Sequence, residues 1–467
     1  MRTVKQLTPH DVMFVGGETR TIHQHTSGLS ILDAGDRGDF GYESMRKFLE
    51  ERLALVPHFR WRLHEVPFGL DLPYWVEDTN FSWDNHIRRI AVPEPGDRDA
   101  LSELVAYLYS RHLDRSRPLW EIWFIEGLEG GQYGLFTKLH HAMMDGQGAN
   151  KLGEMMCDLE ADAAPREVDP AIADARPGEV PERWRESLTA ARHLSMLPVR
   201  AGWEIADSLR RALSDRLSRL GEPRQDQRVP TATFNCEIGT DRAFVYGSLP
   251  FADIKVVKDH FGVTVNDVVL ALVAGSLRAY LQRLGELPEL SLRTSIAVSL
   301  RGDDDAELTN MVTTAGVTLA TALVDPVERL QAIADESSQA KAAARAGGKG
   351  FLDYLGLLPP AMVNMVMSLT PPALVPLVSG FNLMISNVRG APFPLYVGGA
   401  RMTGMFPMSI IAPGAAINVT CISYIDEIDF GFTLEPAVFP DHWQLVDGLS
   451  DVLESYLDVV AAAAPGR

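Results

Sequence analysis

Seven consecutive residues, 140–146, read HHAMMDG and follow directly on an apolar-rich run, residues 133–139, that predicts a strand. The string places two adjacent histidines, a carboxylate and a glycine at one end of that strand. Histidine is the side chain whose unperturbed pKa lets it act as a neutral base near pH 7. The segment therefore predicts a strand end that carries an acid–base site, and a reaction that begins by removing a proton from a hydroxyl or an amine.

Two other interpretations of the string are weaker. A histidine pair at a strand end can be a core feature whose nitrogens are satisfied by backbone carbonyls, and this would be preferred for a single histidine. A metal site is the other interpretation, but His141 and Asp145 supply two ligands at most, whereas zinc usually takes three or four. The sequence has no HExxH or CxxC motif, so no metal is expected.

The length of the chain predicts two domains, because 467 residues exceed what one hydrophobic core usually fills. Hydrophobic residues make up 46% of the sequence and charged residues 22%, a balance typical of globular proteins. The net charge of −19 disfavours binding to nucleic acid, whose phosphates repel an acidic surface. No nucleic-acid partner is therefore expected.

Three observations favour a cytoplasmic protein. The N-terminal residues contain no apolar segment typical of a signal peptide. The three cysteines, Cys157, Cys236 and Cys421, are far apart and odd in number, which indicates a reducing compartment and no disulfide framework. Prolines interrupt the most apolar region, residues 356–381, so we expect two short helices there, one on each side of residues 371–372, and no transmembrane helix.

Hydrophobic periodicity divides the chain into two halves with a similar order of helices and strands. One helix is expected to start at Thr8, with Pro9 in its first position and Asp11 in its third. Further helices are expected at 42–55, 97–112, 251–261, 264–284, 326–344 and 442–463. Strands are expected at 119–126, 133–139, 242–248, 293–300, within 307–323, and at 383–388, 401–408, 416–424 and 427–434. The pattern predicts an α+β protein of two related lobes, with boundaries at 1–158, 159–230 for a linker with amphipathic helices, and 231–467.

The linker contains the best candidate for a surface-binding helix. Residues 159–181 hold four prolines, and a helical pattern follows at 182–220. Within it, residues 206–220 carry an apolar stripe opposite four arginines. A helix of this kind can lie on a membrane or lipid surface. The more common alternative is a helix that packs between two domains and exposes its arginines to water.

Several strings together resemble one known family. HHAMMDG matches the HHxxxDG motif of the CoA-dependent acyltransferase superfamily, which also includes nonribosomal-peptide condensation domains. Pro118-Leu-Trp120 resembles the PLW motif of bacterial wax ester synthase/diacylglycerol acyltransferases. Residues 265–271 (VNDVVLA) resemble their NDVVLA motif, residues 386–390 (SNVRG) their SNVPGP motif, and residues 7–11 (LTPHD) their LSPLD-type start. The resemblance covers nearly the whole chain in the family's order and spacing.

The chain departs from the family pattern at two places. Arg389 stands where the SNVPGP motif has its proline, and only part of a family string is present at residues 309–313. These departures concern the specificity for the acyl group or the acceptor more than the type of reaction.

The resemblance implies a fold and a mechanism. The fold is an α+β two-layer sandwich with two lobes like chloramphenicol acetyltransferase and an active site in a tunnel at their interface. His141 is the general base that takes the proton from an acceptor hydroxyl as its oxygen attacks the thioester of acyl-CoA, without a covalent acyl-enzyme. His140 is a supporting residue behind the base.

The other motif residues are expected to have supporting roles, some implied by the resemblance and some by their own chemistry. Asp145 is a structural anchor that pairs with an arginine of the second lobe, for which Arg301 is the match, and Gly146 permits the tight backbone after the base. Asn266, in the first turn of a helix capped by Thr264, is interpreted either as a donor to the oxyanion or as ordinary helix-start chemistry. Residues expected to line the substrate site are Pro118, Trp120, Met144, Asp267, Ser386 and Asn387.

The resemblance therefore predicts an O-acyltransferase that moves a long-chain acyl group from acyl-CoA to diacylglycerol, a fatty alcohol, or both. Acyl-CoA is a substrate, and no cofactor is expected. Two alternatives stay open, a carrier-protein-dependent acyltransferase of the condensation or polyketide-associated type and a non-catalytic lipid-binding protein of the same fold. The expected location is the cytoplasm, with the inner face of the membrane or a lipid droplet as a peripheral site.

Overall fold

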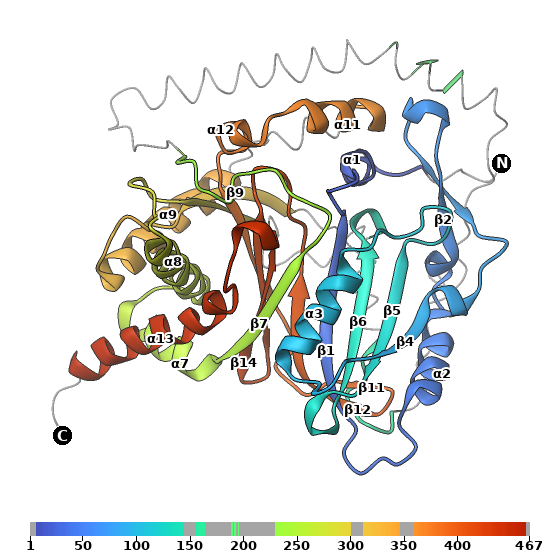
Figure 1. Ribbon diagram of the computed structural model, residues 1–467, viewed down its shortest axis with the longest axis horizontal. Helices are drawn as coiled ribbons and strands as arrows, with labels where there is room; N and C mark the ends of the chain where they lie inside the picture. Colours follow the sequence, from blue (N-terminus) through green and yellow to red (C-terminus); the bar gives the residue numbers. More distant parts are fainter. Residues whose placement is uncertain are drawn as a thin grey trace.

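The computed structural model describes residues 6–143, 156–163, 229–299, 312–345 and 358–463, with a few single residues between 153 and 195. Two six-stranded sheets lie side by side, each with its own helices (Figure 1). The mixture of helices and strands and the two lobes confirm the predicted α+β class.

The first sheet has the strand order β11-β12-β1-β6-β5-β4. Different helices cover its two faces. The apolar side chains of α2 belong to one core cluster, and those of α3 belong to a separate one. The bounds are β1 His25–Asp33, β4 Ile87–Ala91, β5 Trp120–Glu126, β6 Tyr133–His140, β11 Tyr396–Val397, β12 Ala400–Met408, α2 Tyr42–Leu53 and α3 Arg98–Tyr109.

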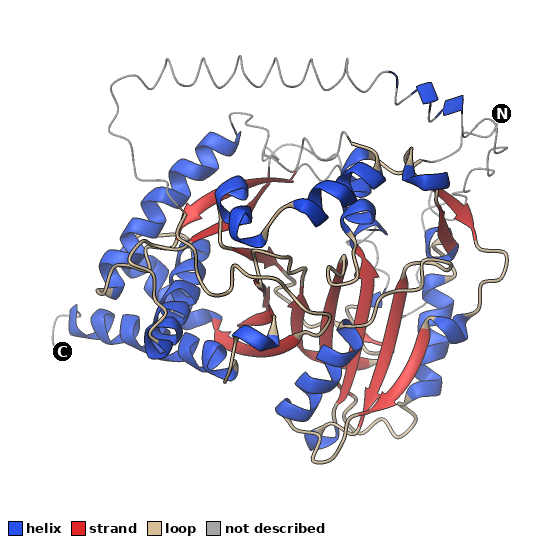
Figure 2. Ribbon diagram, turned by 45° about the horizontal axis from the view of Figure 1, so that its top comes forward, coloured by secondary structure: helices blue, strands red, loops and turns tan. Residues whose placement is uncertain are grey.

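The second sheet has the order β7-β14-β13-β10-β8-β9, and its helices gather on the side away from the first sheet (Figures 1 and 2). The strands are β7 Ala243–Pro250, β8 Arg293–Ser299, β9 Val312–Thr318, β10 Leu383–Arg389, β13 Ile417–Tyr424 and β14 Glu427–Leu434. The helices are α7 Phe251–Phe261, α8 Val265–Leu284, α9 Pro326–Arg345 and α13 Trp443–Ala463.

Smaller elements cover the ends of the sheets. Helices α1 Pro9–Gly17, α11 Pro360–Leu369 and α12 Val375–Ser379 lie across the top of the view in Figure 1, and strands β2 Trp61–His64 and β3 Tyr74–Glu77 form a separate antiparallel pair. Short 3-10 turns are found at Pro57–Arg60, Pro67–Gly69, Trp83–Asn85, Glu129–Gly131, His141–Met143 (η5), Pro372–Leu374 and Pro436–Val438.

Two strands of the C-terminal half, β11 and β12, belong to the first sheet. Strand β12 pairs antiparallel with β1, from Ser27 opposite Met408 to Asp33 opposite Arg401. On β14, the carboxylate of Asp429 accepts a hydrogen bond from the backbone N–H of Met405 (2.7 Å) and so ties β12 to the second sheet. Residues of the C-terminal half thus contribute two strands to the sheet of the first lobe. The predicted domain boundaries stay a prediction. The expected linker lies almost entirely outside the described residues.

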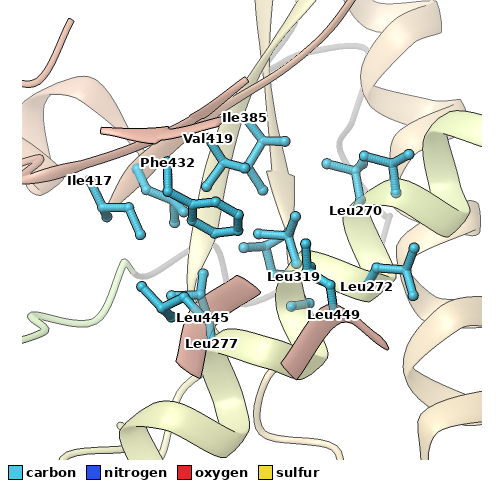
Figure 3. Packing of buried hydrophobic residues seen from close by; sticks show 14 of the residues in the cluster. Leu270, Leu272, Leu277, Leu319, Ile385, Ile417, Val419, Phe432, Leu445 and Leu449 are labelled. Atoms are coloured by element: carbon cyan, nitrogen blue, oxygen red, sulfur yellow. The ribbon is translucent and has the colours of Figure 1, made fainter. Parts of the chain in front are cut away.

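The core of the second lobe is formed around α8. Thr264 and Asp267 form a capping box that starts this helix, and Gly285, with φ of 73°, ends it. Every residue from Asp267 to Leu277 is buried. Figure 3 shows side chains of this cluster from α8, such as Leu270, Leu272 and Leu277, together with others from the sheet, such as Ile385, Val419 and Phe432, and from α13, such as Leu445 and Leu449.

The described residues contain no single helix that is long and apolar enough to cross a membrane. Helices α7 and α8 together meet the length and hydropathy criteria, but their axes are bent by 104°.

Most expected elements are present within a few residues of their predicted ends. The helix starting at Thr8, the paired strands β5 and β6, and the two short helices on either side of the Pro371 break are confirmed. The expected helices at residues 182–220 lie almost wholly outside the described residues. Strands β1, β2, β3, β4 and β11 were not predicted.

Candidate active site

The two histidines of the HHAMMDG string lie at the end of a central strand. His140 is the last residue of β6 and is paired with His25 of β1. His141 opens the 3-10 turn η5, and its backbone N–H donates to the carbonyl of Gln24 at 2.7 Å. The strand end and the turn are therefore fixed by neighbouring backbone, as a site for a positioned base requires.

The ring of His141 stacks on Phe14 of α1, with ring centroids 3.7 Å apart and planes 15° apart. Helix α11 packs on the same α1, and a Cβ on Gly16 would lie 2.8 Å from the carbonyl oxygen of Pro360. This close approach leaves no room for a side chain at Gly16. The imidazole of His141 is therefore held against α1, and α11 from the C-terminal half covers α1.

His140 points into the protein interior. Its side chain is fully buried, and its Nδ1 accepts a hydrogen bond from the N–H of Ala142 at 3.1 Å. Its Nε2 lies 3.7 Å from a carboxylate oxygen of Glu18. This is the place expected of a supporting residue, although the role itself stays a prediction.

Glu18, the residue that follows α1, is the centre of a buried polar cluster. Its Oε1 lies 3.1 Å from Nδ1 of His112, and its Oε2 lies 3.6 Å from a guanidinium nitrogen of Arg115. Burial alone raises the pKa of the Glu18 carboxyl, but the contacts to His112 and His140 and the charge of Arg115 outweigh it and hold that pKa well below its usual range. The carboxylate is therefore charged at neutral pH.

The pKa values of the neighbouring histidines are shifted in different directions. Hydrogen bonding to Glu18 raises the pKa of His112. Burial, reinforced by the charge of Arg242, lowers the pKa of His23 to about 3. Burial and the charge of Lys138 lower the pKa of His25 well below its ordinary value. The cluster thus combines a carboxylate, a histidine whose protonated form that carboxylate favours, and buried histidines whose neutral form is favoured.

Glu18, His25 and His112 offer ligand atoms within 4.8 Å of one another, and no other such group of three occurs in the part of the chain that the structure describes. A metal would need a lone pair on His112. Both ring nitrogens of His112 face acceptors, however, with Glu18 at 3.1 Å and the carbonyl of Arg20 at 3.2 Å. The arrangement is that of a hydrogen-bonded ion cluster, and Arg115 already supplies positive charge there.

Two motif residues of the second lobe come together. The side-chain amide of Asn387 on β10 donates to the side-chain oxygen of Asn266 at 3.5 Å. The other end of the Asn266 amide, Nδ2, is buried and has no hydrogen-bond partner among the described residues. An unused buried donor of this kind is available to a bound oxygen. Ser386 precedes Asn387 on β10, where it pairs with Thr420 of β13.

Asp267 serves the helix. Its Oδ2 accepts hydrogen bonds from the backbone N–H (3.0 Å) and the hydroxyl (2.6 Å) of Thr264, and Lys341 lies 3.7 Å from its Oδ1. These contacts agree with the capping interpretation of this residue. Its expected role in substrate binding stays a prediction.

Trp120 and Pro118 are buried in the first lobe. The indole N–H of Trp120 donates to the carbonyl of Phe59 at 2.8 Å, and the ring stacks on His86 with centroids 4.5 Å apart. Trp120 is 1% exposed. Its contacts are those of a core residue that supports the start of β5, whereas we expected it to line the substrate site, and that role stays a prediction.

Four predicted site residues, Met144, Asp145, Gly146 and Arg301, lie outside the described residues. The expected Asp145–Arg301 pair therefore stays a prediction. Arg389, which replaces the family's proline, is exposed at the end of β10.

Sequence reasoning missed Phe14, Glu18, His25 and His112. Glu18 is 94 residues from His112 in the chain, and no short motif links them. For two of them the sequence contains an indirect signal only. Phe14 lies on the helix that was predicted to start at Thr8, and Glu18 directly follows that helix.

Two family models match the chain. The model described as "wax ester synthase/diacylglycerol acyltransferase catalytic domain" matches residues 7–269. The model described as "WS/DGAT C-terminal domain" matches residues 308–456. The chain belongs to the wax ester synthase/diacylglycerol acyltransferase family. It is an acyltransferase, and the predicted family and enzyme class are confirmed.

Similar proteins support the assignment over nearly the full length. A Mycobacterium tuberculosis protein named "putative diacylglycerol O-acyltransferase" is 33% identical over 462 residues, which cover 97% of this chain and 90% of the relative. Another M. tuberculosis protein with the same descriptive name is 35% identical over 445 residues, which cover 91% of this chain and 93% of the relative.

Among solved structures, the wax ester synthase/diacylglycerol acyltransferase of Marinobacter aquaeolei VT8 matches with a TM-score of 0.73 and 28% identity, and the match covers 98% of this chain and all of that one. The starter condensation domain of rhizomide synthetase matches with a TM-score of 0.56 at 12% identity, covering 98% and 95%. The second match shows a shared fold.

Proposed function

We propose that this acyltransferase moves a long-chain acyl group from acyl-CoA to a lipid hydroxyl, of diacylglycerol, a fatty alcohol or both, with His141 as general base. The observation that carries the proposal is the position of His141 at the end of β6, where its backbone is tied to Gln24 and its ring is stacked on Phe14. A second histidine is buried directly behind it.

In the proposed reaction, the acceptor oxygen attacks the thioester carbonyl while His141 takes the hydroxyl proton. A free alcohol is almost fully protonated at neutral pH, and a positioned imidazole that shares the proton during attack gives about 10²–10⁴-fold in rate. Collapse of the tetrahedral intermediate expels CoA as the thiolate, which recovers a proton from the imidazolium. No serine or cysteine nucleophile and no cofactor takes part.

The unpaired amide of Asn266 is proposed to stabilise the oxyanion of that intermediate. Its Nδ2 is a buried donor at the N-terminus of α8, where unpaired backbone N–H groups add positive potential. Asn387 holds the amide in one orientation through its hydrogen bond to the side-chain oxygen of Asn266.

The acceptor is a lipid, so the enzyme is proposed to work in the cytoplasm at the periphery of a membrane or lipid droplet. The amphipathic segment 206–220 is the proposed contact, as the pattern of its sequence indicates.

The test is release of CoA, followed with a thiol reagent at a fixed concentration of palmitoyl-CoA. The acceptors are diacylglycerol, a fatty alcohol and an acyl-acceptor carrier protein in separate reactions, and the His141→Ala variant is the control. We expect turnover with at least one lipid alcohol and a loss of at least about 10²-fold in the variant. Turnover with the carrier protein alone would contradict the proposed acceptor, and a folded variant with full activity would contradict the proposed base.

A further inference from the structure

We propose that Glu18 is a positioning residue for acyl transfer. Its buried carboxylate is clamped by His112 and Arg115, and it fixes the ring orientation and tautomer of His140. His140 in turn holds the short turn that presents His141. The inference rests on the proposed role of His141 as the base.

The first argument comes from two buried atoms that face each other. Nε2 of His140 and Oε2 of Glu18 lie 3.7 Å apart, on side chains that are 0% and 5% exposed. Neither atom has a hydrogen-bond partner among the described residues. A buried donor or acceptor left without a partner destabilises the folded protein. A charge-assisted N–H···O bond is about 2.7–2.9 Å long, so a shift of about 1 Å completes this one and satisfies both atoms.

The tautomer of His140 follows from its other nitrogen. Nδ1 accepts the N–H of Ala142 at 3.1 Å, so Nδ1 carries the lone pair and Nε2 carries the proton. The charge of Glu18 stabilises a ring whose N–H points toward it. If the ring protonated Nδ1 instead, it would lose the hydrogen bond from Ala142, which directly follows the base in the turn η5.

The carboxylate itself is held from several sides. His112 lies 3.1 Å from Oε1 and Arg115 lies 3.6 Å from Oε2. The side-chain amide of Asn364 on α11 donates to the backbone carbonyl of Glu18 at 3.3 Å. Glu18 directly follows α1, the helix that carries Phe14. The position of this helix therefore determines both where the aromatic ring meets His141 and where the charge of Glu18 meets His140. The first residue after α1 thus couples the helix to the turn.

The chain offers a matched control in Glu65. Its carboxylate pairs with Nε of the same Arg115 at 3.0 Å, but its side chain is 53% exposed. No contact of Glu65 with His140 is present in the described part of the chain. Replacing Glu65 by Gln therefore tests loss of an Arg115 partner without loss of the charge that faces His140.

The experiment compares Glu18→Gln, Glu18→Ala and Glu65→Gln with the wild type and with His141→Ala. For each folded protein, kcat and KM for acyl-CoA are measured, and ¹⁵N NMR of histidine-labelled protein reports the tautomer of His140, assigned with a His140→Gln sample. We expect both Glu18 variants to lose on the order of 10²-fold in kcat, the cost of a misplaced catalytic group, with little change in KM. The Nε2–H signal of His140 should be present in the wild type and altered in these variants, and Glu65→Gln should behave as the wild type.

Two results would overturn the inference. One is a folded Glu18→Gln protein with the kcat of the wild type and an unchanged His140 spectrum. The other is a wild-type spectrum in which His140 carries its proton on Nδ1, a result that needs no variant to fold. If His141→Ala retains full activity, the proposed function of His141 fails, whereas activity lost in His141→Ala but kept in Glu18→Gln contradicts the positioning role alone.

Discussion

The end of β6 in the first lobe and helix α8 in the second lobe are both buried, but their neighbours differ in kind. Around α8, apolar side chains from the sheet and α13 fill the interior (Figure 3). Around His140, the neighbours are the carboxylate of Glu18 and the ring of His25, which is itself close to the rings of His23 and His112. Several buried nitrogens there, including both of His23, have no hydrogen-bond partner among the described residues.

This difference separates stability from function. Apolar burial near α8 stabilises the fold at no polar cost. Burial of ionisable groups near His140 costs free energy unless they are paired, and clusters of perturbed ionisable groups are typical of functional sites. Substitutions of the apolar residues packed around α8 should therefore change the free energy of unfolding, whereas substitutions of the polar groups at the proposed site should change rates or pH dependence.

The largest expected effect is on the stability of the second lobe. Phe432 on β14 is fully buried in the cluster around α8. Phe432→Ala should lower the free energy of unfolding by about 3–5 kcal/mol, through lost apolar burial and the cavity left behind. Chemical denaturation measures the change, and activity per folded molecule should stay close to that of the wild type. A loss of activity larger than the loss of folded protein would break the comparison.

The next effect is on the rate. Asn266→Ala removes the buried amide that is proposed to donate to the oxyanion, and kcat should fall by about 10²–10³-fold. Steady-state kinetics with palmitoyl-CoA checks this, with Asn387→Ala expected to show a smaller loss because it only orients the amide. If Asn266→Ala lowers the free energy of unfolding but leaves kcat unchanged, the residue is a helix-start residue and no more.

The pH dependence of stability should come from the first lobe. Because burial lowers the pKa of His23 to about 3, the unfolded chain takes up a proton below pH 6.5 and the folded protein does not. Stability should therefore fall between pH 6.5 and 3, by about 1.4 kcal/mol per pH unit for each such histidine. The lowered pKa of His25 acts in the same direction, and the raised pKa of His112 in the opposite one.

Unfolding curves at several pH values measure this slope. A His23→Phe variant should reduce the slope of unfolding free energy against pH by the contribution of one histidine, about 1.4 kcal/mol per pH unit. An unchanged slope in His23→Phe would show that this histidine is not held neutral by burial.

The smallest expected effect separates packing from chemistry within the first lobe. Trp120→Phe removes the N–H that donates to the carbonyl of Phe59. The buried carbonyl loses its partner, and the free energy of unfolding should fall by about 1–2 kcal/mol. If Trp120 is a core residue, kcat and the acyl-chain preference stay unchanged. A shift in chain-length preference, measured across a series of acyl-CoAs, would instead support the predicted role at the substrate site.

Local patterns in the sequence were sufficient to predict most of the fold. Helix α8 was predictable because Thr264, Asp267 and Gly285 mark its ends and its apolar residues recur at helical spacing. Strand β1 was missed because its sequence, HTSGLSILD, contains a glycine and small polar residues among few apolar ones. It is stabilised by pairing with β6 on one side and β12 on the other, and such contacts carry no local signal.

The candidate site was predictable only where a motif carries it. His141 and Asn266 belong to strings with a family resemblance, and the structure brings Asn266 next to Asn387 as two motif residues of one lobe. The support of the base was not predictable, because Glu18 meets His112 and His140 across long stretches of chain. The placement of β12 in the first sheet depends on the same kind of long-range pairing.

The most direct test of the central claim is a single-turnover experiment with labelled palmitoyl-CoA and excess enzyme. With the acceptor alcohol present, wild-type enzyme should form labelled ester in one step, and His141→Ala, folded to the same extent, should do so about 10²–10⁴-fold more slowly. Without acceptor, no label should remain on the denatured protein of either form. An equal rate in the variant, or a covalently labelled acyl-enzyme that reacts on addition of the alcohol, would contradict direct transfer with His141 as the base.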